Sequence, residues 1–275
     1  MKVLILGAKG SLGQTFLDVY KDHEVIGWDR TELDITDEHA VIQKISELKP
    51  NLIINCAAYN AVDKAEDEKE VANLINGNAP GFIAKAAAKI NATMVHFGSA
   101  YVFAGDKQTG YNEDDLTNPL SAYGKSKLLG EIELAVNCQN FYLIRTTWLY
   151  GRESHGGKPS FVEVMLKLAE QGQQIKSIGD EFGQPTYVLD LAQATRALVE
   201  HEKPFGIYHI INEGQASWYD WAKEIFLIKN KSVDLMSMSR REFVRKAARP
   251  QYGILNNTKF IQLRPWTEAL REYLQ

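Results

Sequence analysis

Tyr123 and Lys127 are four residues apart in the sequence. On a helix, this spacing puts both side chains on one face. A lysine ammonium near a phenol lowers the phenol pKa, so that the tyrosine can protonate an alkoxide as it forms. Any amphipathic helix can carry such a pair by chance. Together with a nucleotide-binding turn, however, the pair predicts hydride transfer, with Lys127 also binding the ribose of a nicotinamide cofactor.

Ser99 follows an apolar run, residues 93–97, that is typical of a strand. At the carboxyl end of a parallel strand, its hydroxyl can hydrogen-bond a substrate carbonyl and stabilise developing negative charge. A serine at a strand end is also often a simple cap or turn residue. With Tyr123 and Lys127 downstream, it predicts a Ser-Tyr-Lys catalytic group.

A glycine-rich turn connects the first apolar run, residues 3–6, to a segment of helical period, residues 11–20. Such glycines let the backbone turn tightly and approach a pyrophosphate at the helix N-terminus. Three glycines can also form a plain structural turn, but their place in a βαβ pattern favours dinucleotide binding. The residues predicted to contact the cofactor here are Gly7, Gly10, Ser11, Leu12 and Gly13.

Asp29 ends the second apolar run, where a carboxylate can bind the 2′-hydroxyl of the adenine ribose. Arg30 beside it could instead bind a 2′-phosphate. The two residues point to different cofactors, so the sequence predicts NADPH or NADH without deciding between them. Asp34 and Ile35 are expected to flank the adenine, although Asp34 fits a turn or cap equally well.

These side chains need a scaffold that brings them together. Short apolar runs alternate with segments of helical period through the first half of the chain, which is typical of βαβ units and a parallel sheet. Strands are predicted at residues 3–6, 24–28, 52–55, 93–97, 141–145 and 207–211, and helices at 11–20, 37–48, 83–90, 160–171 and 188–200. The predicted fold is α/β, a Rossmann-type doubly wound parallel sheet with a smaller, mostly helical C-terminal substrate lobe.

The sequence changes character after residue 150, where a polar, glycine-rich stretch begins at residue 151. We therefore predict a dinucleotide-binding domain from 1–150, to which 188–212 returns. The second lobe is then discontinuous, built from 151–187 and 213–275. From residue 217 onward it is expected to be mostly helical, with breaks at Arg249-Pro250 and Arg264-Pro265.

Charge and composition argue against several classes of protein. The net charge of −4 argues against nucleic-acid binding or membrane-surface binding as the main activity. No apolar run approaches the ~20 residues that a membrane span needs, and a cytoplasmic protein is expected. Cys56 and Cys138 form no metal-ligand spacing, and no metal is predicted. The one cationic cluster suggests a solvated helix face or a site for an anionic substrate; it comprises Arg240, Arg241, Arg245, Lys246 and Arg249.

The glycine turn and the Tyr-x-x-x-Lys pair resemble the extended short-chain dehydrogenase/reductase family. Longer motifs resemble the dTDP-4-dehydrorhamnose reductases within it. These motifs are NCAAY (55–59), AVDKAE (61–66), SAYVF (99–103), RTTWLY (145–150), DEFGQPT (180–186) and Arg-Pro (249–250). The resemblance extends over nearly the whole chain.

The resemblance implies reduction of the 4-keto group of dTDP-4-dehydro-L-rhamnose to dTDP-L-rhamnose with NADPH or NADH. It implies that Ser99 polarises the carbonyl, Tyr123 donates the proton and Lys127 orients the reactants. It also implies cofactor contacts for Ala57, Ala58 and Tyr59, and substrate contacts for Tyr101, Trp148 and Arg249. The alternative for Trp148 is a strand-end aromatic in the core. A homodimer is compatible with the sequence.

Two departures from the family pattern leave the exact sugar and base open: Ala100 replaces a common Asp, and Gly253 a usual Ser. Sugar-nucleotide dehydratases need an Asp-Glu pair where this chain has Ala100-Tyr101, which favours net reduction over elimination. A related epimerase/reductase is one alternative. Another is a non-catalytic NADP-binding subunit that resembles the methionine adenosyltransferase β subunit, although the intact Ser-Tyr-Lys group argues against it.

Overall fold

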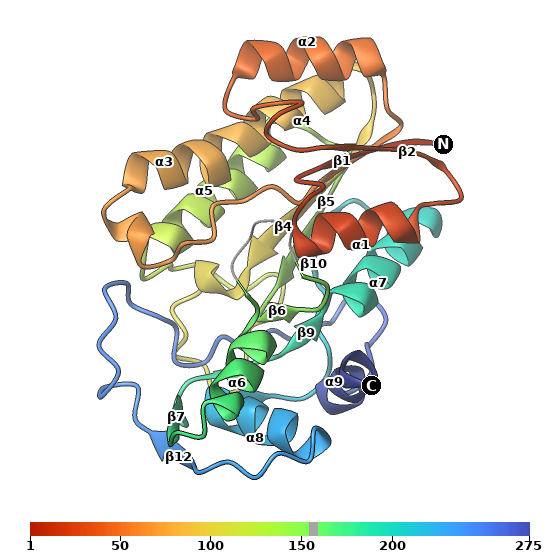
Figure 1. Ribbon diagram of the computed structural model, residues 1–275. Helices are drawn as coiled ribbons and strands as arrows, with labels where there is room; N and C mark the ends of the chain where they lie inside the picture. The colour runs from red at the N-terminus through yellow and green to blue at the C-terminus, as the bar shows by residue number, and fades with distance from the viewer. Residues whose placement is uncertain (154–158) are drawn as a thin grey trace.

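The computed structural model describes residues 1–153 and 159–275. Its centre is a six-stranded parallel sheet in the order β10-β5-β4-β3-β1-β2 (Figure 1). The strands are β1 (Lys2–Leu6), β2 (Glu24–Trp28), β3 (Leu52–Asn55), β4 (Thr93–Ser99), β5 (Phe141–Thr146) and β10 (Gly206–His209). Because β2 and β3 lie on opposite sides of β1, the strand order reverses between β1 and β3. Ligands of doubly wound sheets bind at the carboxyl ends of the strands at such a point.

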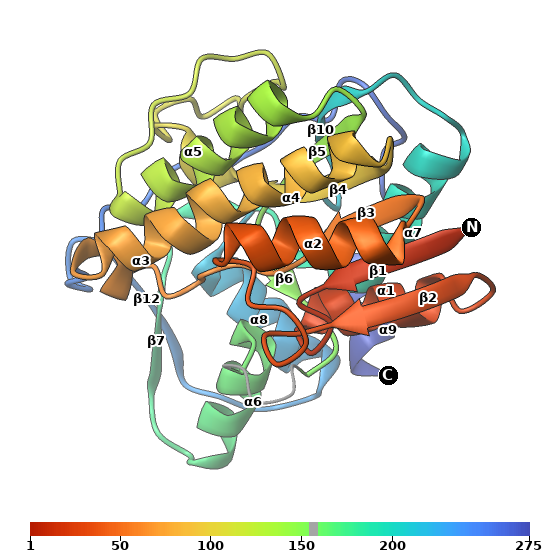
Figure 2. The ribbon, with the colours of Figure 1, turned by 90° about the horizontal axis from the view of Figure 1, so that it is seen from above.

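Helices cover both faces of this sheet, as the doubly wound class requires. One face packs against α1 (Ser11–Val19) and α7 (Val188–Glu200). The other packs against α2 (Glu38–Leu48), α4 (Ala79–Lys89) and α5 (Ala122–Asn137), which lie side by side in Figure 2. Short helical segments precede α4, namely η1 (Lys64–Glu66), α3 (Lys69–Asn73) and the π-helical η2 (Leu74–Asn78), and η3 (Ala100–Val102) follows β4. The predicted α/β class is confirmed.

The rest of the chain forms a smaller part with a hydrophobic core of its own, which includes Trp221 and Trp266. Its helices are α6 (Phe161–Glu170), α8 (Trp218–Ile228) and α9 (Trp266–Leu274). Among the described residues, its strands form three two-stranded sheets: β6 (Leu149–Tyr150) with β9 (Thr186–Tyr187), β7 (Ile175–Ile178) with β12 (Leu235–Met238), and β8 (Phe182–Gly183) with β11 (Ala216–Ser217). In the orientation of Figure 1, this part lies below the carboxyl edge of the central sheet.

The prediction that the chain is mostly helical after residue 217 is wrong. Within 213–275, all of which the structure describes, α8 and α9 are the only helices, and residues 239–265 are irregular. The backbone of this segment is bound by other parts of the protein instead of by its own turns. Ala247 N–H donates to the Asp63 carboxylate, Tyr252 N–H to the Gly105 carbonyl, and Gly253 N–H to the Phe182 carbonyl. The cationic cluster therefore lies on an irregular segment, not on a helix face.

No helix in the described ranges combines the length and apolar character that a bilayer crossing requires. The domain boundaries drawn from the sequence stay a prediction.

Candidate active site

A cavity of about 970 Å³ opens at the carboxyl edge of the central sheet and extends to the smaller part. It brings together every residue predicted for the site except Arg249. The predicted residues that line it are Gly7, Gly10, Ser11, Leu12, Gly13, Asp29, Arg30, Asp34, Ile35, Ala57, Ala58, Tyr59, Ser99, Tyr101, Tyr123, Lys127 and Trp148. The strand reversal explains this convergence, because β1, β3, β4 and β5 all end at the same edge.

Helix α5 carries Tyr123 and Lys127 on one buried face, as their spacing requires. The helix begins after Ser121, whose side chain accepts a hydrogen bond from Gly124 N–H at 3.1 Å. A Cβ at Gly124 would lie 2.3 Å from the Tyr101 carbonyl oxygen, so the glycine lets the helix approach that loop closely. The Tyr101 and Tyr123 rings then pack edge to face, with 5.4 Å between their centroids. This contact fixes the Tyr123 ring at the cavity wall.

The Lys127 ammonium is held at the end of β4. Its Nζ donates to the carbonyl oxygen of Phe97 at 2.6 Å. Burial lowers the Lys127 pKa to about 8, and the nearby Glu131 carboxylate opposes that shift. Glu131 is itself buried and accepts hydrogen bonds from Arg145 Nε at 3.1 Å and Nη2 at 2.8 Å. A buried row of charges therefore runs from the cavity into the interior along α5.

The Tyr123 phenol differs from the sequence expectation. Burial raises its pKa, and the group that opposes this rise is Ser99, through a hydrogen bond, rather than Lys127. In this structure the Lys127 ammonium is bound to the Phe97 carbonyl. Ser99 also accepts a hydrogen bond from Tyr101 N–H at 3.2 Å. The serine hydroxyl is thus directed at the phenol.

The glycine turn forms a cradle of exposed backbone at the N-terminus of α1. Gly7 has φ +76°, and a Cβ on it would lie 2.7 Å from Ala57 N. A Cβ on Gly13 would lie 2.3 Å from the Gly7 carbonyl oxygen. Ser11 opens the helix with a buried Oγ that has no hydrogen-bond partner among the described residues. These features fit the diphosphate of a dinucleotide, which needs close backbone approach and hydrogen-bond donors.

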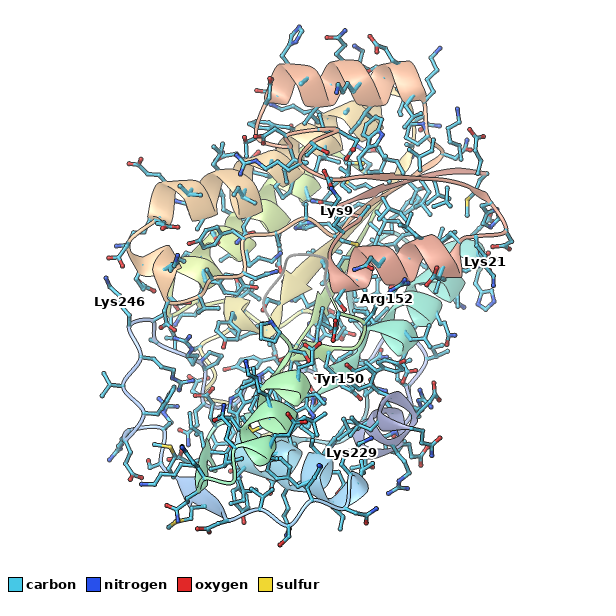
Figure 3. All side chains as sticks on the ribbon, viewed as in Figure 1. Lys9, Lys21, Tyr150, Arg152, Lys229 and Lys246 are labelled. Carbon is cyan, nitrogen blue, oxygen red and sulfur yellow. The ribbon has the colours of Figure 1, made fainter. Side chains whose placement is uncertain are left out.

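The adenosine end of the cradle carries charges that already have partners. The Asp29 carboxylate accepts from Thr31 N–H at 2.7 Å and pairs with Lys9, which holds the Asp29 pKa below its usual range. Arg30 is 86% exposed and lies 3.4 Å from Asp34. Lys9 is therefore a second cation, besides Arg30, at the predicted ribose site (Figure 3). The sequence analysis did not include Lys9, although it lies inside the glycine turn.

Trp148 lies in an aromatic cluster at the opposite end of the cavity. Its ring stacks on the Trp218 ring, with 3.8 Å between the centroids, and its centroid is 5.8 Å from that of Trp221. Its backbone is left-handed, with φ +46°, which is unusual for a bulky residue. Trp218, Trp221 and Phe161 also line the cavity, and the sequence analysis missed all three. Nothing in their spacing separates them from ordinary core aromatics.

Arg249 does not line the cavity, contrary to expectation. Its guanidinium makes two hydrogen bonds of 2.7 Å to the two carboxylate oxygens of Asp63, and its side chain is 10% exposed. Asp63 follows the cavity-lining residues 57–62, so the ion pair attaches the irregular segment to the cavity wall. An arginine committed to a carboxylate in this way is not directed at a diphosphate.

Other buried groups at the site have unused hydrogen-bonding capacity. Thr146 pairs in register with Ser99, and its Oγ1 has no partner in the described part of the chain. Trp221 Nε1 is in the same situation. Both residues line the cavity and were not foreseen. Within residues 1–153 and 159–275, no three His, Cys, Asp or Glu side chains gather as a metal site would require.

The parallel sheet and its crossovers define a Rossmann-type α/β protein of the short-chain dehydrogenase/reductase kind. Comparisons with known proteins identify the family. A family model described as "RmlD substrate binding domain" matches residues 1–275. The spore coat polysaccharide biosynthesis protein SpsK of Bacillus subtilis is 39% identical, over 100% of this chain and 97% of its own.

Two further relatives are named as reductases of dTDP-linked keto sugars or of dTDP-4-dehydrorhamnose. A probable dTDP-4,6-dihydroxy-2-methyloxan-3-one 4-ketoreductase of Streptomyces antibioticus is 37% identical, over 99% of this chain and 94% of its own. The crystal structure of dTDP-4-dehydrorhamnose reductase from Bacillus anthracis in complex with NADP is 35% identical, with a TM-score of 0.94 over 99% of this chain and 98% of that one. The chain belongs to the dTDP-4-dehydrorhamnose reductase family, the group that its sequence motifs resemble.

Proposed function

We propose that this protein reduces the 4-keto group of a dTDP-activated 6-deoxy-4-keto sugar with NADPH or NADH, with dTDP-4-dehydro-L-rhamnose as the first candidate substrate. The observation that carries the proposal is the shared cavity of the Ser99-Tyr123-Lys127 group and the glycine turn. Full-length membership of the reductase family supports it, as does the NADP bound in the relative from Bacillus anthracis.

Each residue of the Ser99-Tyr123-Lys127 group has its own role in the proposed reduction. When bound, the reduced nicotinamide supplies the hydride that adds to C4 of the sugar. The Tyr123 hydroxyl gives its proton to O4, so that the carbonyl becomes an alcohol and the charge balances. Ser99 Oγ hydrogen-bonds O4 and stabilises the negative charge that develops there. Lys127 keeps a positive charge beside the phenolate that remains.

The two parts of the chain take different roles in this proposal. Residues 1–150 and 188–212 bind the cofactor through the glycine turn and the wall at Ala57, Ala58 and Tyr59. Residues 151–187 and 213–275 bind the sugar nucleotide. Tyr101 and Trp148 belong to residues 1–150 but line the same cavity, which supports the sugar contacts proposed for both.

The test is a stoichiometric assay with the purified protein. With dTDP-4-dehydro-L-rhamnose, one NADPH is consumed for each dTDP-L-rhamnose formed, as followed by nicotinamide absorbance and by chromatography of the sugar nucleotide. Turnover of the sugar without net NADPH oxidation would indicate an epimerase. NADPH binding without turnover of any keto sugar would indicate a non-catalytic binding subunit.

The identity of the sugar has a second candidate. The relative from Streptomyces antibioticus is named for a differently substituted dTDP-keto sugar, and it resembles this chain as closely as the rhamnose reductases do. The same assay with both keto sugars compares the two values of kcat/KM. The larger value identifies the preferred substrate class.

A further inference from the structure

Glu181 connects the irregular segment of residues 239–249 to the aromatic end of the cavity. The residue is 2% exposed. Trp218 Nε1 donates to Glu181 Oε1 at 3.0 Å, and Arg245 Nη1 donates to the same oxygen at 3.2 Å. Arg245 Nη2 pairs with the second oxygen. This buried carboxylate therefore has one aromatic N–H partner and one cationic partner.

Trp218 in turn holds Trp148. The two indoles stack with 3.8 Å between ring centroids and 23° between planes. Trp148 has the left-handed backbone noted above, and a Cβ at Gly183 would lie 2.5 Å from its ring. A strained backbone of this kind persists only where the surroundings fix it. The position of the Trp148 ring therefore depends on the ring that stacks on it, and that ring is bound to Glu181.

We propose that Glu181 is a positioning residue that acts through Trp218 to hold the Trp148 ring at the sugar end of the cavity, and so sets the affinity for the sugar nucleotide. The reacting groups Ser99 and Tyr123 are not affected. The identity of the ligand rests on the proposed function, whereas the arrangement of the two indoles does not.

Asp180 offers a matched control on the neighbouring position. Its carboxylate accepts from Ser239 Oγ at 2.7 Å and from Arg240 N–H at 2.5 Å. It therefore anchors the same segment as Glu181 does, but its hydrogen bonds go to that segment and not to Trp218. Loss of the Asp180 carboxylate tests whether loosening the segment is enough to disturb the cavity.

The experiment compares Glu181→Leu, Glu181→Gln and Asp180→Asn in the full-length protein. Glu181→Leu removes the bonds to both Trp218 and Arg245. We expect KM for the dTDP-4-keto sugar to rise about tenfold or more while kcat and the Kd for NADPH stay near those of the parent. The circular-dichroism exciton couplet of the stacked indoles should be lost. Glu181→Gln keeps an acceptor for Trp218 N–H and should retain the couplet and most of the affinity. Asp180→Asn should change neither.

An unchanged couplet and KM in Glu181→Leu would overturn the proposal, as would an equal rise in KM for Asp180→Asn. If Glu181→Leu does not fold, Trp218→Phe removes the N–H donor but keeps an aromatic ring. It should raise KM with an unchanged Kd for NADPH, and an unchanged KM contradicts the proposal. If the parent oxidises no NADPH with any keto sugar, the proposed function fails, while loss of the couplet in Glu181→Leu still supports the positioning role.

Discussion

The Lys127 ammonium donates a 2.6 Å hydrogen bond to the carbonyl oxygen of Phe97. This bond joins helix α5 to the carboxyl end of β4, two residues before Ser99. It fixes the distance between the helix that supplies the proton donor and the strand that supplies the hydroxyl. The proton donor on α5 and the hydroxyl at the end of β4 therefore line the same cavity.

The charge on Lys127 predicts the alkaline limit of activity. Burial lowers the Lys127 pKa to about 8, so the ammonium loses its proton as the pH rises through that value. The Tyr123 pKa is raised, so the phenol still carries its proton there. We expect kcat/KM to fall above about pH 8, as measured by a pH-rate profile. In Lys127→Arg, which stays charged, the decline near pH 8 should be absent; a decline that persists would assign it to another group.

The Glu131 carboxylate affects the pH at which kcat/KM falls on the alkaline side. Its carboxylate raises the Lys127 pKa and opposes the effect of burial. Glu131→Gln keeps an oxygen that can accept from Arg145 but removes the negative charge. The alkaline limb of kcat/KM should then move to a lower pH than in the parent. A shift to higher pH would contradict the assignment of the limb to Lys127.

Tyr123→Phe separates proton transfer from cofactor binding. The phenol hydroxyl acts in the transition state, so its loss should lower kcat by about 10²- to 10⁴-fold. The Kd for NADPH, measured by nicotinamide fluorescence, should change little. Lys127→Ala should weaken both turnover and cofactor binding. Equal losses of kcat and affinity in Tyr123→Phe would remove the phenol from the role of proton donor.

Gly13→Ala tests the cradle at the N-terminus of α1. The new Cβ would lie 2.3 Å from the Gly7 carbonyl oxygen and 2.9 Å from Ala8 Cα, which are backbone atoms that cannot move aside alone. We expect the affinity for NADPH to fall and the free energy of unfolding to drop by about 1–3 kcal/mol. Gly172→Ala is the control, because φ is +66° there and no atom lies within 4 Å of the new Cβ. It should cost about 1–2 kcal/mol from backbone strain without changing NADPH binding.

The Asp63–Arg249 ion pair predicts a component of acid sensitivity. Arg249 lowers the Asp63 pKa to about 2, below its model-peptide value of 3.8. A carboxyl whose folded pKa is depressed stabilises the protein above its unfolded pKa and loses that effect as the pH falls through the folded pKa. The free energy of unfolding should therefore decrease between about pH 4 and pH 2. In Asp63→Asn this pH-dependent component should be missing. Denaturant titration at neutral pH should show only a modest loss in the free energy of unfolding, because the Asp63 side chain is 46% exposed. A parallel pH dependence in the parent and the variant would contradict the assignment.

Local patterns allowed most of the first half of the fold to be predicted. The helix of residues 188–200 agrees with α7, and α2 begins after Asp37 and ends at Leu48 as its cap and the following Pro50 indicate. The irregular segment after residue 238 could not be predicted in this way. Its polar backbone groups bind Asp63, Gly105 and Phe182, which are far away in sequence.

The sequence by itself determined the residue types that can do the chemistry, the helical face shared by Tyr123 and Lys127, and the glycines that the turn before α1 needs. These depend on short-range geometry, which local spacing encodes. Only the tertiary structure decided that Arg249 binds Asp63, that the Lys127 ammonium binds the Phe97 carbonyl, and that Trp218 stacks on Trp148. The partners of these charges and rings are residues far away in the sequence, which come into contact only when the chain folds. Such long-range contacts produce no periodic pattern in the sequence.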